Sequence, residues 1–315
     1  IDLREKMLKD MKSNQQSCFS ALNEYGQYGK NSEFYRMKPI KELRATKPET
    51  ILATAKLLKT HSHIVLYYGP MELKQVVAAI DKHHKVAKRL ISDANAKHIL
   101  CENTPKDEVY LAPYDAKNII MVMYNCEGRK YDAAKLPLES LFNAYYGGGM
   151  NAIVFQELRE TRGLAYSAFA NYAYPHYRDQ KEKFYTYISS QNDKMLDCIS
   201  TFKQIIDTIP QNQKAFDIAK ESLLKNIATE RTIKINLLTS QLTAERLGLG
   251  KPLSQHIYEG VQNLTLQDLV DFANTHIAHK PFRYIILGNE QELDIKALER
   301  IAPIRRLTLE EVFNF

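Results

Sequence analysis

The sequence has no long hydrophobic run. Although 44% of its 315 residues are hydrophobic, no stretch of 18 consecutive apolar residues occurs. A helix that crosses a membrane needs about 20 such residues. With 25% charged residues, the composition is typical of a globular protein, and we expect no membrane partner. The chain is long enough for two modules, each with its own core.

Cysteine is scarce, with only Cys18, Cys101, Cys126 and Cys198. No two of them form the C-x-x-C pair of a zinc ribbon, and their wide spacing is not that of a disulfide-rich framework. The spacing therefore argues against both kinds of site. It leaves the redox state of the thiols, and with it the cellular compartment, open.

A dense basic stripe is also missing. The net charge is +6, but lysine and arginine are spread along the chain, and basic blocks such as "KHHKVAKR" (Lys82–Arg89) are short. Proteins that bind nucleic acids usually concentrate these residues on one face or helix. We therefore expect no nucleic-acid partner.

Two segments of the chain follow the same plan. Residues Lys47–Lys85 and Thr265–Ala302 each predict an amphipathic helix, a β-rich run that ends in glycine, and a second helix. The repeat, which aligns Gly69 with Gly288, has a period of about 220 residues and is too long for a solenoid. It indicates duplicated modules.

The first copy is shorter than the second. Only 68 residues precede Gly69, and the sequence begins "IDLREKML" without an initiator methionine. We therefore expect residues 1–106 to be the C-terminal part of one module plus a linker. Residues 107–315 are expected to form a complete second module, within a longer natural protein.

Strand and helix patterns alternate in this second module. β-rich runs occur at Val109–Gly128, Leu164–Pro175 and Lys183–Gln191, and the last two alternate with a period of two residues. Helical spacing marks Leu136–Tyr146 and most of residues 192–248. The pattern predicts an α+β fold of two-layer modules, in which helices gather on one face of a largely antiparallel sheet.

Three consecutive glycines, Gly147, Gly148 and Gly149, raise the possibility of a phosphate loop. Such a loop follows a strand and usually carries a lysine at a fixed offset, which a nucleotide-dependent enzyme would need. Here the glycines follow a predicted helix, and no lysine occurs between Gly147 and Lys181. They are more typical of a helix–helix connection that needs positive φ and close backbone approach.

The segment after the glycines predicts a second helix. Its buried stripe is expected to contain Met150, Ile153, Val154 and Leu158, and Gly163 should end it. Arg162 is expected to pair within the helix.

Arg159 and Tyr166 flank the turn from this helix into a strand. Both side chains donate hydrogen bonds, and such a pair suits a carbonyl oxygen that gains negative charge. The alternative for Tyr166 is a tyrosine buried in the strand.

The stretch "FQELRETRGLAYS" resembles the signature of the C-terminal half of inverted-zincin metallopeptidases, the family of pitrilysin, insulin-degrading enzyme and mitochondrial processing peptidase. The residues that match are Leu158, Arg159, Gly163, Leu164 and Tyr166. The preceding "YYGGGMNAIVFQE" is similar to the same region of bacterial members. Together with the repeat, the resemblance extends over essentially the whole chain.

The resemblance implies a clamshell of four α+β modules, with zinc on an H-x-x-E-H helix of the first module. This chain would be the substrate-binding half of a zinc metalloendopeptidase. Tyr166 and Arg159 would be catalytic and would bind the substrate and its oxyanion, with Gly148 and Gly149 also contacting substrate. The expected partners are a peptide or small-protein substrate and the N-terminal catalytic half of the same protein.

The chain itself lacks the zinc motif. Among its nine histidines no two are four residues apart, so we expect zinc outside this chain and no activity from the fragment alone. The alternative is a non-catalytic structural or substrate-binding member of the family. The upstream half of the protein would decide between the two.

Overall fold

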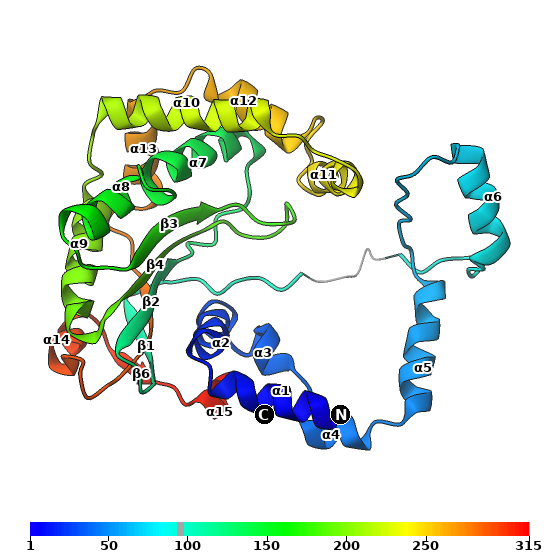
Figure 1. The fold of residues 1–315 in the computed structure, drawn as a ribbon, viewed down its shortest axis with the longest axis horizontal. Coiled ribbons are helices and arrows are strands. Elements are labelled where there is room, and N and C mark those ends of the chain that lie inside the picture. The colour runs from blue at the N-terminus through cyan, green and yellow to red at the C-terminus, as the bar shows by residue number, and fades with distance from the viewer. Residues whose placement is uncertain (93–97, 315) are drawn as a thin grey trace.

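The structure is a computed structural model that describes residues 1–92 and 98–314. Its central feature is a six-stranded sheet with the order β3-β4-β2-β5-β1-β6 (Figure 1). The strands are β1 (Glu108–Pro113), β2 (Asn118–Asn125), β3 (Ser167–Ala173), β4 (Lys183–Gln191), β5 (Arg283–Gly288) and β6 (Ile304–Arg306).

The sheet is mixed. Strands β3, β4, β2 and β5 pair antiparallel, with Ala170 opposite Thr186 and Val122 opposite Ile285. Strand β1 runs parallel to both β5 and β6. Since β5 returns to the sheet only after the long helical segment, it can lie parallel to β1. The predicted α+β fold, with its helices layered on a sheet, is confirmed.

Most helices of the second module cover one face of the sheet (Figure 1). The helix α9 contributes a buried stripe at helical spacing, which includes Cys198, Phe202 and Ile206. The Asn212 side chain caps α10, and a reciprocal capping box between Thr265 and Asp268 starts α13. These helices are α7 (Leu136–Phe142), α9 (Met195–Asp207), α10 (Gln213–Thr229), α12 (Leu253–Val261), α13 (Leu266–His276) and α14 (Ile295–Ile301), and α11 (Ile235–Arg246) contacts α12.

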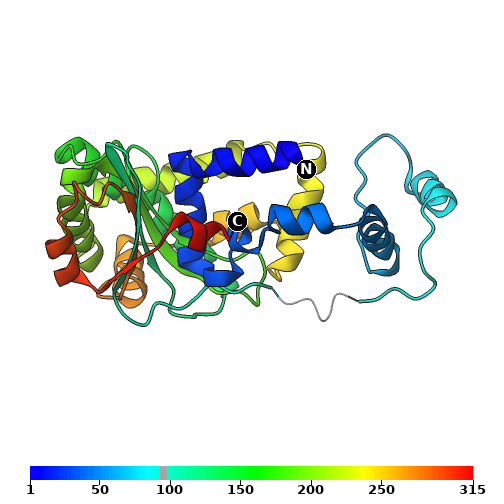
Figure 2. The same ribbon diagram turned by 90° about the horizontal axis from the view of Figure 1, so that it is seen from below.

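The opposite face of the sheet is covered by the helix α2 (Gln15–Tyr28). Its buried Phe19, Leu22 and Tyr25 belong to a second apolar cluster with residues of β1, β2 and β5. Helices α1 (Asp2–Lys12), α3 (Glu33–Arg36) and α15 (Leu309–Phe313) complete this layer (Figure 2). The predicted module boundary at residues 106 and 107 stays a prediction.

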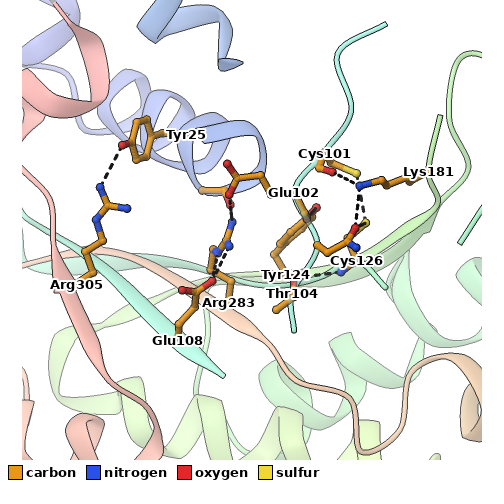
Figure 3. A network of polar contacts seen from close by, with 12 residues as sticks. Tyr25, Cys101, Glu102, Thr104, Glu108, Tyr124, Cys126, Lys181, Arg283 and Arg305 are labelled. Atoms are coloured by element: carbon orange, nitrogen blue, oxygen red, sulfur yellow. Dashed lines mark hydrogen bonds and ion pairs between the residues drawn. The ribbon is translucent and has the colours of Figure 1, made fainter. Parts of the chain in front are cut away.

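A buried arginine ties α2 to the sheet. Arg283 on β5 donates to the backbone oxygen of Gly26 and pairs with Glu108 at 2.6 Å and with Glu102 at 3.1 Å (Figure 3). Its side chain is only 5% exposed. The interaction therefore joins three segments that are far apart in the sequence.

The short helix α4 (Ile40–Ala45) leads from α3 to a projecting arm formed by α5 (Pro48–Leu57), α6 (Leu73–His83) and the segment between them (Figures 1 and 2). Both longer helices lie where the repeat predicts them. The β-rich run "HIVLYYG" between them, residues 63–69, is not a strand, and the nearest pairing is a bridge from His61, just before the run, to Ile91. No described strand lies alongside it, so its backbone has no ladder to join.

No helix within residues 1–92 and 98–314 is long and apolar enough to cross a membrane.

Candidate functional site

The strand β3 lies at the edge of the sheet and pairs only with β4. At its C-terminal end, the Asn143 side chain accepts from the Tyr172 N–H at 2.7 Å and donates to the Tyr172 carbonyl at 2.9 Å. Backbone groups of successive strand residues point to opposite sides. The N–H and C=O groups of Ala168 and Ala170 therefore also face away from β4.

The glycine connection, Gly147–Gly149, lies against this edge and covers it at Ala170. A Cβ atom added to Gly147 would lie 1.9 Å from the carbonyl oxygen of Ala170, and Gly149 has φ of +93°. Close backbone approach and positive φ, the two features predicted for a helix–helix connection, are confirmed. Gly148 and Gly149 are exposed and carry no side chain that would cover the strand.

The helices on both sides of the glycines contain π-helical turns. The segment η5 (Asn143–Gly147) continues α7, and η6 (Gln156–Thr161) continues the short α8 (Ile153–Phe155). Such turns are rare and often occur at functional sites.

The predicted buried stripe of the second helix is correct for Ile153, Val154 and Leu158 but wrong for Met150. Met150 is 74% exposed, because α8 begins only at Ile153 and Met150 belongs to the connection. Gly163 has φ of +60° and follows the last turn, as predicted.

Arg159 and Arg162 have different surroundings on η6. The Arg159 side chain is half exposed, lies over the Phe155 ring at 5.0 Å and is 3.9 Å from Glu160. Arg162 pairs with Glu157 at 3.5 Å and donates to Gln204 on α9 at 3.1 Å. Pairing within the helix is therefore confirmed for Arg162, whereas Arg159 has only a weak ion pair.

Tyr166 is 62% exposed, so the alternative of a buried strand tyrosine is wrong. Its N–H donates to the Ser189 carbonyl at 2.9 Å, which fixes its backbone just before β3. Its hydroxyl has no hydrogen bond within the described residues. Together with Gly163, Leu164, Gln191 and Lys194, Tyr166 lines a small open cavity of about 180 Å³.

Two side-chain hydrogen bonds fix the turn before Tyr166. The Leu164 carbonyl accepts hydrogen bonds from the Ser190 hydroxyl and, at 3.7 Å, from the Cys198 thiol. The turn thus places Arg159 and Tyr166 on exposed surface near one end of the sheet edge. No hydrogen bond joins the two side chains in the described residues.

No group of three or more metal-binding side chains comes together in residues 1–92 and 98–314. The nearest approach of two histidines is in the arm, where the Nε2 atoms of His63 and His84 are 2.8 Å apart. Two ligands do not make the tetrahedral set that zinc prefers.

Sequence reasoning missed a buried pair of acids. Burial, together with the negative charge of Glu182, raises the pKa of Glu139 to about 8. Glu182 is also buried and accepts from the Tyr172 hydroxyl at 2.9 Å and from the Asp132 N–H at 3.1 Å. One signal was available, because Glu139 is three residues before the buried Phe142 in the predicted helix.

Comparison with known proteins agrees with this architecture. The family model described as "Peptidase M16 inactive domain" matches residues 56–223, more than half of the chain. No curated protein matches this chain.

Three similar solved structures share the fold. A peptidase M16 inactive domain from Pseudomonas fluorescens is 18% identical with a TM-score of 0.66, and the match covers 91% of this chain and 69% of that one. For pitrilysin the identity is 11%, the TM-score 0.63 and the coverage 98% and 33%. A mutant of the ferredoxin protease FusC, solved in complex with Arabidopsis ferredoxin, is 11% identical with a TM-score of 0.64 and coverage of 86% and 29%.

This chain thus spans about a third of the length of pitrilysin, and the resemblance stated from the Arg159–Tyr166 stretch is confirmed. The chain belongs to the peptidase M16 family, through the domain that the family model describes as inactive.

Proposed function

We propose that this chain is the substrate-binding half of a zinc-dependent peptidase. The observation that carries the proposal is the exposed side chain of Tyr166, which lies just before β3, the edge strand of the sheet. A group so placed can donate to a peptide that lies along the edge.

The substrate would be an extended peptide segment that adds a strand to the sheet. The N–H and C=O groups of Ala168 face away from β4 near the start of the strand, before Gly147 covers Ala170, and strand addition uses such groups for affinity. Because Gly148 and Gly149 have no side chains, they would let the peptide approach. The ferredoxin in the FusC structure supports a peptide or small protein as the substrate class.

Tyr166 and Arg159 would act on the carbonyl groups of this peptide. The phenol would donate a hydrogen bond to a carbonyl oxygen as it gains negative charge, and the nearby guanidinium would add positive charge. A preorganised donor of this kind contributes about 10²–10³ in rate.

The residues of this chain do not fit a zinc ion, since no suitable cluster occurs among those described. Zinc and the general base would therefore come from the N-terminal half of the same protein. We expect the isolated chain to bind peptide and to hydrolyse none.

Replacing Tyr166 with phenylalanine in the full-length protein tests the assignment. We expect kcat/KM for a peptide substrate to fall about 10²–10³-fold, because the phenylalanine ring keeps the shape but lacks the donor. Tyr258→Phe, at another exposed tyrosine on α12, should keep wild-type activity. An unchanged kcat/KM for Tyr166→Phe, with an unchanged melting temperature, would remove the role of Tyr166.

A second candidate is a non-catalytic member of the family that binds or positions substrates. The matching family model favours it, because it describes an inactive domain. Zinc-dependent cleavage by the full-length protein would exclude this candidate. Peptide binding without cleavage, weakened by Tyr166→Phe, would support it.

A further inference from the structure

Two cysteines are in contact where the linker between the arm and β1, here residues 98–107, meets the sheet. The Sγ atoms of Cys101 and Cys126 are 3.4 Å apart, and both side chains are buried (Figure 3). A disulfide bond is about 2.05 Å long, so the sulfurs need to move only about 1.4 Å to close one. Sequence spacing gave no sign of this pair, because it forms only when the linker lies beside the end of β2.

The backbone around the two thiols is already fixed. The Thr104 N–H donates to the Cys126 carbonyl at 2.8 Å, and the Cys126 N–H donates to the Thr104 hydroxyl at 3.3 Å. On the other side, the Lys181 ammonium donates to the Cys101 carbonyl and to Asn103 Oδ1, both at 2.8 Å. The two segments that carry the sulfurs are therefore held side by side.

Cys101 is also reachable from outside. It lines an open cavity of about 380 Å³ between α2 and the β3–β4 hairpin. Lys181 and Lys183 also line this cavity. Lys181 and Lys183 outnumber the one acidic residue of the cavity wall, Glu24, and this balance of charge suits an anionic reagent.

The two thiols are not equivalent. The hydrogen bond between the two sulfurs, with help from the two lysines, lowers the pKa of Cys101, whereas that hydrogen bond and burial raise the pKa of Cys126. Cys101, which lines the cavity beside the two lysines, is the thiol of the pair placed to attack a disulfide, and thiolates are the attacking species in disulfide exchange.

We propose that Cys101 and Cys126 form a thiol–disulfide pair that is oxidised by a small anionic disulfide of the glutathione type. The Cys101 thiolate attacks one sulfur of the reagent, whose S–S bond breaks and releases one thiolate, which takes up a proton. Cys126 then loses its proton to solvent and attacks Cys101 Sγ, which releases the second half of the reagent as a thiolate that takes up a proton. The protein loses two electrons, and the reagent gains them.

The product would be a covalent link between the linker to the arm and β2. Cys18 and Cys198 serve as internal controls, because burial raises the pKa of both, that of Cys18 to about 11. Neither lines the cavity at Cys101.

The test is to incubate the folded chain with oxidised glutathione at neutral pH, alkylate all free thiols under denaturing conditions, and map the peptides by mass spectrometry. We expect Cys101 linked to Cys126, with Cys18 and Cys198 alkylated, and complete reversal by dithiothreitol. Trypsin cleaves after Lys106 and Lys117, so Cys101 and Cys126 fall in different peptides, which stay together only if a disulfide bond joins them.

Variants test the order of the steps. Cys126→Ser should stop at a glutathione adduct on Cys101, Cys101→Ser should form neither adduct nor link, and Cys18→Ser should behave as the wild type. Four free thiols in the treated wild-type chain, or a link through Cys18 or Cys198, would overturn the proposal. The wild-type map decides this even if a variant fails to fold.

Discussion

Among single residues, Glu139 combines an acidic side chain with complete burial. Its carboxyl group is fully buried on α7, and neither of its oxygens has a hydrogen-bond partner within the described residues. With its pKa raised to about 8, it is protonated at neutral pH in the folded protein. In the unfolded chain it would ionise near its ordinary pKa of about 4.3.

The stability contribution of Glu139 therefore changes with pH. It is fully present below about pH 4 and is lost as the pH rises to about 8, since only the unfolded state ionises in that range. In Glu139→Gln this slope should disappear. We expect the variant to gain about 3 kcal/mol relative to the wild type between pH 5 and 8, measured by urea unfolding. The exposed Glu299→Gln should show no such trend, and parallel pH profiles for wild type and Glu139→Gln would contradict the burial argument.

The candidate site shows what a sequence can and cannot predict for residues. Gly163 and the exposed Tyr166 follow from a local motif, because turn geometry and chain reversal depend on neighbours in the sequence. The contacts between Cys101 and Cys126 and between Glu139 and Glu182 depend on how segments that are far apart in the sequence come together in the fold. No local pattern encodes that pairing.

Among the elements, the connection Gly147–Gly149 leaves the least room for a side chain, at Gly147. A Cβ on Gly147 would lie 1.9 Å from the Ala170 carbonyl oxygen, so η5 or β3 would have to move. We expect Gly147→Ala to lower the free energy of unfolding by about 3 kcal/mol, at the upper end of the range for forced insertions. Chemical denaturation measures the change.

Gly250→Ala is the matched control, because no atom lies within 4 Å of its added Cβ and its φ is not positive. It should leave stability close to that of the wild type. Equal stabilities for the two alanine variants would mean that the close approach at Gly147 relaxes without cost.

The longer helices and buried strands could be predicted because each carries a strong repeating apolar pattern. Helices α9 and α10 and strand β4 are examples. The run at residues 63–69 has the composition of a strand but not its structure, because a strand also needs a partner. The π-helical turns were missed, since helical periodicity assumes 3.6 residues per turn.

For the whole molecule, Arg283 joins α2, the linker and the sheet (Figure 3). Replacing it with methionine leaves Glu102 and Glu108 without their shared partner. We expect a loss of about 3 kcal/mol in unfolding free energy, as for other broken buried pairs. Limited proteolysis should cleave residues 1–36 faster in this variant.

Arg306→Met is a suitable control, because Arg306 pairs with Glu290 at the surface and is half exposed. It should cost less than about 1 kcal/mol. If both variants unfold alike and resist proteolysis alike, Arg283 does not hold the N-terminal helices on the sheet.

The arrangement of the whole molecule was the least predictable level. The sequence indicates strands and helices within residues 107–315, but not that α2 covers the second face of the sheet. It also does not indicate that β1 runs parallel to its neighbours. Both depend on contacts between segments far apart in the chain.

The π-helical turns also limit how this region can change in evolution. Each i→i+5 turn holds one more residue than an α-helical turn, so η5 and η6 each resemble the product of a one-residue insertion. Deleting one codon there would leave a regular helix but would rotate the chain beyond it by about 100°. Gly147 would then turn away from Ala170. Apart from Gly147 and Arg159, the region between Asn143 and Tyr166 should therefore accept changes of side chain more readily than changes of length.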